Sequence, residues 1–173
     1  MYDDHMNARR KAHAATVFFG FLAAGVIAYR APYTPLFLPD SMFVAMLLAH
    51  TYLSVDLFAR IQTDEWAQWG IDALLLASYA WLVLSIGTTV AFFFANLALF
   101  IVAPIKYAHL IERIPHHKLL RRKILVDLSG TALAASMLGI ALLGYPTIAA
   151  WTLTILFALA SVRYLVTHPL YRL

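Results

Sequence analysis

Long uncharged stretches dominate the pattern of polar and apolar positions along the chain. The four longest lie between Lys11 and Arg30 (18 residues), Asp40 and Asp56 (15), Asp72 and Lys106 (33), and Asp127 and Arg163 (35). A helix needs about 20 mostly apolar residues to cross the hydrocarbon core of a bilayer. The first two stretches therefore predict one membrane-spanning helix each, and the last two predict a pair of helices each.

Glycine and proline mark turns within the two longest stretches, at residues 87–89 and 144–146. We predict an all-α membrane protein with six transmembrane helices arranged as three helical hairpins. The predicted helices cover 13–30, 37–60, 67–86, 89–109, 123–143 and 147–167. They form one domain, 13–167, whose hairpins are 13–60, 67–109 and 123–167. A basic loop occupies 110–122, and residues 1–12 and 168–173 are tails.

Composition supports a membrane protein. Apolar residues make up 62% of the 173 residues and charged residues only 13%, whereas soluble domains average about 45–50% and about 25%. This balance excludes a soluble enzyme. The absence of cysteine excludes disulfides and thiolate metal sites.

Charge distribution predicts the orientation. Arg30 is the only one of the 13 Lys and Arg residues expected on the side opposite the termini. Basic residues are retained in the cytoplasm during insertion, so both termini should be cytoplasmic, in a prokaryotic inner membrane. A cleaved signal peptide is the alternative for the first helix, but no small-x-small cleavage site is evident. Basic residues after the fourth helix should contact anionic lipid headgroups, namely Lys118, Arg121, Arg122 and Lys123.

Counting from the turns predicts two ion pairs, Asp72 with Lys106 and Asp127 with Arg163, because residues equidistant from a hairpin turn lie at the same depth. Similar residues at the hairpin ends also suggest an internal repeat. The pairs could simply fix the register of each hairpin, since pairing relieves the cost of a charge in the membrane. Alternatively, they could form a polar vestibule that faces the cytoplasm.

Some polar residues fall deeper in the predicted spans. His50 lies halfway along the second helix and could relay protons, because an unperturbed imidazole titrates between about pH 5 and 8. A lone histidine at this depth more often makes an interhelical hydrogen bond to a carbonyl or hydroxyl group. Asn96 is expected to hold neighbouring helices together, and Asp56 lies four residues before Arg60 on the same helix face.

A metal site is a weaker possibility near the basic loop. Histidine and carboxylate side chains suit transition metals, and the candidates are His109, Glu112, His116 and His117. The surrounding cations would repel a metal ion, and the sequence indicates no particular cofactor.

The sequence favours a transporter or channel protomer for an ion or small solute, because ionisable groups within a membrane mark candidate functional sites. The candidate polar cluster is His50, Asp56, Asp72, Asn96, Lys106, Asp127 and Arg163. The alternative is an accessory, assembly or sensor subunit whose charges are structural. A third possibility is a membrane enzyme that acts on lipid. The expected partners are anionic lipids and other subunits, as a homo-oligomer or within a membrane complex, and not nucleic acid.

Overall fold

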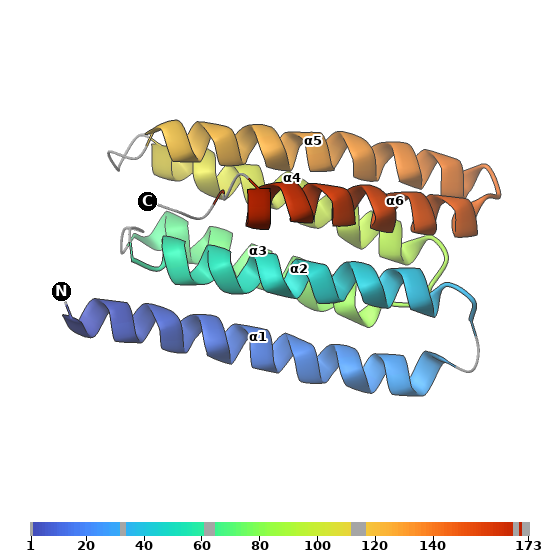
Figure 1. Cartoon of the computed structure of the whole chain (residues 1–173), viewed down its shortest axis with the longest axis horizontal. Helices are drawn as coiled ribbons and strands as arrows, with labels where there is room; N and C mark the ends of the chain where they lie inside the picture. Colours follow the sequence, from blue (N-terminus) through green and yellow to red (C-terminus); the bar gives the residue numbers. More distant parts are fainter. Residues whose placement is uncertain (1, 32–33, 61–64, 112–116, 168–169, 171–173) are drawn as a thin grey trace.

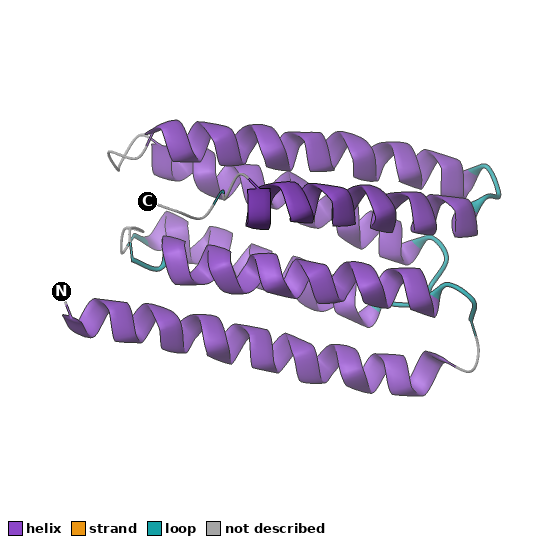
Figure 2. Cartoon of the chain, viewed as in Figure 1, coloured by secondary structure: helices purple, strands orange, loops and turns teal. Residues whose placement is uncertain are grey.

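The computed structural model describes residues 2–31, 34–60, 65–111, 117–167 and 170, with side chains from residue 7 onward. Within these ranges the chain forms six α-helices and one π-helical segment (Figures 1 and 2). They are α1 (Tyr2–Arg30), α2 (Phe37–Phe58), α3 (Trp66–Leu84), α4 (Ala91–Ile111), α5 (His117–Leu142), α6 (Pro146–Ser161) and η2 (Val162–Thr167). Six helical segments of this described part are long and apolar enough to cross a membrane, which confirms the number predicted from the sequence.

Glycines allow the tight connections at the ends of α3 and α5. Gly87 and Gly144 have positive φ angles of 76° and 94°, a conformation that glycine adopts at little cost because it lacks a Cβ atom. Pro146 then occupies the first turn of α6, where its missing N–H group has no helical partner to lose. Both connections fall where the sequence predicted turns.

The helices form an antiparallel bundle, with both chain termini at the same end (Figure 1). We call this the terminal end, and the opposite one the distal end. The most extensive packing joins α4 to α5, while α1 packs on α2 and α3, and α6 on α5 and α2. The most extensive contact therefore links two helices assigned to different hairpins, and the grouping into three hairpins stays a prediction.

Two helices begin earlier than the sequence analysis expected. α1 starts at Tyr2, so the predicted tail at 1–12 is largely helical; its Ala, Met, Arg and Lys residues favour a helix. α5 starts at His117, so the cationic residues assigned to a loop occupy its first two turns. The residues between α4 and α5, 112–116, lie outside the described residues.

Apolar side chains pack in two clusters of unequal size. The larger fills the distal half of the bundle and includes Phe43, Phe92, Leu82 and Ile86, all nearly inaccessible to solvent. The smaller, around Phe58, lies near the terminal end. The outer surface is also apolar. Exposed side chains such as Phe21, Leu74 and Leu159 would be costly in water. Together with the helix lengths, they identify an integral membrane protein.

Gly130 permits the close approach of α5 to α4. A Cβ atom built at this position would lie 2.6 Å from ring atoms of Phe100. In addition, the hydroxyl of the neighbouring Thr131 donates a hydrogen bond of 2.7 Å to the Phe100 carbonyl. Small residues commonly allow such approaches between membrane helices.

We expect Gly130→Ala to destabilise the protein by about 1–3 kcal/mol, because overpacking forces the Phe100 ring to shift. Gly139→Ala is the matched control on the same helix, since no atom lies within 4 Å of its added Cβ. Thermal unfolding in detergent should separate the two variants. Equal melting temperatures would mean that α4 and α5 do not meet at Gly130.

Candidate functional site

A cavity of about 350 Å³ lies between the distal core and the terminal end. All six helices contribute to its wall, so it is a central feature of the bundle. Its lining changes character with depth. Ionisable side chains occupy the part near the terminal end, namely Lys11, Asp72, Lys106, Lys123 and Asp127. Deeper in, the wall is formed by aliphatic and aromatic side chains, including Phe19, Leu47, Leu99 and Leu153.

His50 faces this cavity at the boundary between the two zones. Its Nε2 atom and Ser161 Oγ form a hydrogen bond of 2.9 Å, which connects α2 to α6. The imidazole also packs against Phe157, with ring centroids 5.3 Å apart. His50 is therefore both an interhelical contact and part of the cavity wall.

Two further hydrogen bonds link α2 to its other neighbours beside the cavity. The Thr51 hydroxyl is hydrogen-bonded to the Tyr79 hydroxyl of α3. The Ser54 and Tyr107 hydroxyls lie 3.0 Å apart, which joins α2 to α4. Sequence reasoning did not include these hydroxyls in the candidate cluster. The signals in the sequence were that Ser54 follows His50 by one helical turn and that Tyr79 lies near the middle of its predicted helix.

The predicted ion pair between Asp72 and Lys106 is present. Lys106 Nζ lies 2.7 Å from Asp72 Oδ1, and the Gln68 amide donates a hydrogen bond of 2.9 Å to the same oxygen. The pair connects α3 to α4 across the cavity wall. Counting residues from the turn was sufficient to predict it.

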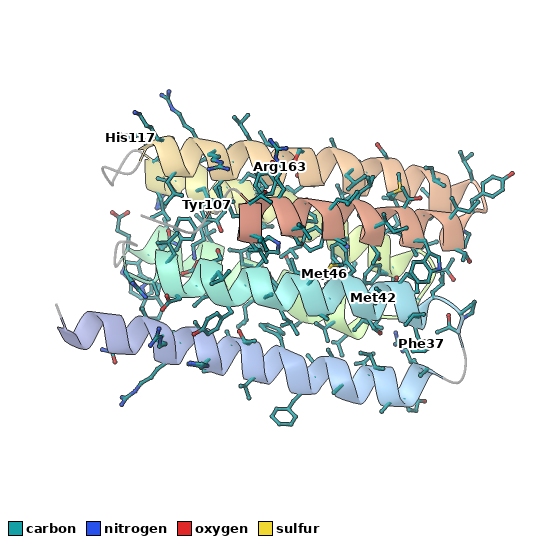
Figure 3. All side chains as sticks on the ribbon, viewed as in Figure 1. Phe37, Met42, Met46, Tyr107, His117 and Arg163 are labelled. Carbon is teal, nitrogen blue, oxygen red and sulfur yellow. The ribbon has the colours of Figure 1, made fainter. Side chains whose placement is uncertain are left out.

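The predicted pair between Asp127 and Arg163 is wrong. The Asp127 carboxylate is instead paired with Lys123, one turn earlier on α5. Lys123 had been assigned to the lipid headgroups, but it is buried, and its ammonium lies 5.2 Å from the centre of the Tyr107 ring. Arg163 lies in η2 and is exposed (Figure 3). The ion pair within one helix needs no tertiary contact, and this explains why it replaces the longer-range one.

Other candidates lie away from the cavity. Asp56 pairs with Arg60, which lies just beyond the end of α2, and neither residue lines the cavity. Asn96 is completely buried beside the distal core, and its side-chain amide has no hydrogen-bond partner among the described residues. The structure therefore gathers four of the seven candidates at the cavity: His50, Asp72, Lys106 and Asp127.

The weaker metal candidates do not come together within the described residues. His109 contacts Glu65, with 3.7 Å between Nε2 and the carboxylate. His117 is exposed at the terminal end (Figure 3), and Glu112 and His116 lie outside the described residues. In the part of the chain that is described, no group of three potential metal ligands is present.

Exposed cations lie on the first turns of α5. Lys118, Arg121 and Arg122 are all accessible, and the Arg122 guanidinium lies 5.9 Å from the centre of the Tyr164 ring. Their predicted contact with lipid headgroups stays a prediction.

Comparisons of the chain with protein-family models, curated proteins and solved structures gave no match. Fold and surface thus place the chain among multi-pass α-helical membrane proteins. Any more specific conclusion depends on the cavity.

Proposed function

We propose that this protein is a carrier protomer that moves a small solute across the membrane through the central cavity. The single observation behind this proposal is the cavity itself. It is lined by all six helices, reaches ionisable groups near the terminal end and has an apolar deep end. Its volume falls within the range of about 300–1,000 Å³ typical of small-molecule sites.

Closure of the distal half supports a carrier rather than an open channel. The side chains beyond the cavity pack closely, and Phe43 lies in edge-to-face contact with Phe92. Polar contacts also fasten the helix ends there. The Arg30 guanidinium donates to the Ile86 carbonyl, and the buried Asp40 accepts from the Gly87 N–H group, each at 2.9 Å. A carrier in this conformation would be closed toward the distal end.

The proposed orientation follows from charge. With the terminal end in the cytoplasm of a prokaryotic inner membrane, the cavity would face the cytoplasm. Lys118, Arg121 and Arg122 would then lie near anionic headgroups of that leaflet, where each basic residue contributes about 1 kcal/mol of attraction. Six helices form a small bundle, and assembly as a homo-oligomer or within a complex is part of the same proposal.

One observation favours the alternative of a non-transporting accessory subunit. Both carboxylates at the cavity are already paired with lysines, Asp72 with Lys106 and Asp127 with Lys123. The first pair could serve only to hold α3 and α4 in register, and the second, within α5, only to relieve the cost of a buried charge. The two functions differ in whether the deep end of the cavity ever becomes accessible from the distal side.

Accessibility of an introduced thiol tests the proposal without knowledge of the solute. The chain has no cysteine, so single-cysteine variants can be compared directly. Leu133→Cys places a thiol in the cavity wall on α5. We expect a membrane-impermeant maleimide to label it from both faces, in intact cells and in inverted vesicles, because a carrier alternates between two openings.

Leu128→Cys is the matched control, because Leu128 is exposed on the outer surface of the same helix and does not line the cavity. It should stay unlabelled from either face, since the reagent does not enter lipid. Labelling of the Leu133→Cys variant from the terminal side alone would favour the accessory subunit. Labelling of both variants from both sides would mean that the bundle does not span the membrane as proposed.

A further inference from the structure

The positive and negative charges of the side chains in the cavity wall do not cancel. Three lysines, Lys11, Lys106 and Lys123, face two carboxylates, Asp72 and Asp127. Each carboxylate is engaged by a lysine, at 2.7 Å in the case of Lys106 and Asp72. With the lining imidazole neutral, the cavity has a net charge of one positive unit.

Lys11 accounts for this excess. It lies on α1 at the terminal end of the cavity, and no ion pair joins it to a carboxylate among the described side chains, which begin at residue 7. Arg9 and Arg10 precede it on the same helix, and together with Lys11 these three basic residues outnumber the two acidic residues nearer the start of the helix, Asp3 and Asp4. Because exposed like charges near an opening attract ions of opposite sign, the entrance favours an anionic group.

The deep end of the cavity favours an apolar group. From Lys11, the α1 part of the wall continues through Ala15 to Phe19, which is buried. On the opposite side, the wall includes Phe100 and Phe157, whose ring centroids lie 6.3 Å apart. Apolar surface removed from water contributes about 25 cal/mol per Å², so a hydrocarbon or aromatic tail would be stabilised in this part of the cavity.

We propose that the cavity binds an amphipathic organic monoanion, with its anionic head near Lys11 and Lys106 and its apolar tail between Phe19, Phe100 and Phe157. This proposal names the ligand class of the site on which the proposed function rests. The competing class is an organic cation, because Asp127 Oδ2 is buried and accepts no hydrogen bond from the described residues. A cation would have to enter against the net positive charge.

Binding is tested with three eight-carbon probes that differ only in the head group: octanesulfonate, octyltrimethylammonium and octyl glucoside. The full chain is placed in lipid nanodiscs, and heats of binding are corrected with empty nanodiscs. We expect saturable binding of octanesulfonate at least tenfold tighter than that of the other two probes. Tighter binding of octyltrimethylammonium, or equal affinity for all three, would overturn the proposal.

Two pairs of variants locate the ligand. Lys11→Gln should weaken octanesulfonate binding about fivefold to tenfold, whereas Lys118→Gln, at an exposed position of α5 outside the cavity wall, should change it less than twofold. Ala15→Trp should abolish binding by filling the cavity, while Ala14→Trp, exposed on the neighbouring position, should not. If octanesulfonate binds equally to all four variants, it lies elsewhere and the assignment is wrong.

The two sets of experiments distinguish a failure of the proposed transport activity from a failure of the proposed ligand class. Binding that Ala15→Trp abolishes, in a protein whose Leu133→Cys variant is labelled from one side only, would support the ligand class and contradict the carrier. Two-sided labelling without octanesulfonate binding would support the carrier and overturn the ligand class.

Discussion

Replacing Lys123 by methionine is expected to destabilise the protein by about 3–5 kcal/mol. The substitution leaves the Asp127 carboxylate, which is only 2% exposed, without its ion-pair partner. Removing one member of a buried ion pair is far more costly than removing both, because an uncompensated charge then stays in a medium of low dielectric constant. Thermal unfolding in detergent measures the effect.

The matched variants separate this explanation from a general effect of lost charge. Lys118→Met removes an exposed lysine of the same helix and should change stability by less than about 0.5 kcal/mol. The double variant Lys123→Met/Asp127→Leu should recover most of the stability lost by the single one. If Lys123→Met proves as harmless as Lys118→Met, the buried pair does not form in the protein.

Replacing His50 by alanine should reduce transport at least tenfold while leaving most of the stability intact. The imidazole forms part of the cavity wall where the ionisable zone meets the apolar zone. A solute that passes between the two zones must therefore pass beside it. The structural cost is the loss of its hydrogen bond to Ser161, which corresponds to about 0.5–2 kcal/mol.

Ser161→Ala is the informative control for His50→Ala. It removes the same hydrogen bond but keeps the imidazole in the cavity. Under the proposed function, both variants lose similar stability and only His50→Ala loses transport. If His50 is only an interhelical contact, the two variants will show the same stability and the same flux.

Hydropathy and turn residues were sufficient to predict the six helices, because the thickness of the bilayer sets the length of one spanning helix and glycine or proline marks where a longer apolar stretch turns back. They were also sufficient to predict that Asp72 meets Lys106, since equal distance from a turn gives equal depth. The same count failed for Asp127. It considered partners across the turn, although Lys123, four residues earlier on the same helix, was available.

The rotation of each helix about its axis could not be predicted from the sequence. Residues that face lipid are as apolar as those that face the core, so hydropathy does not show which side of a membrane helix is buried. Asn96 illustrates this. The sequence included it in the polar cluster, but its helix is rotated so that the side chain is buried beside the distal core and does not line the cavity. The cavity and its hydroxyl-lined wall require the tertiary arrangement.

Solute flux tests the central claim, that this cavity is part of a transport pathway, most directly. Purified protein in sealed liposomes should take up radiolabelled octanesulfonate, which is permanently charged and crosses a lipid bilayer slowly by itself. We predict saturable uptake well above that of protein-free liposomes, at least tenfold lower for His50→Ala and unchanged for Ser161→Ala. Uptake no faster than in protein-free liposomes, for octanesulfonate and for the cationic and neutral probes alike, would contradict the claim and leave the accessory subunit as the better account.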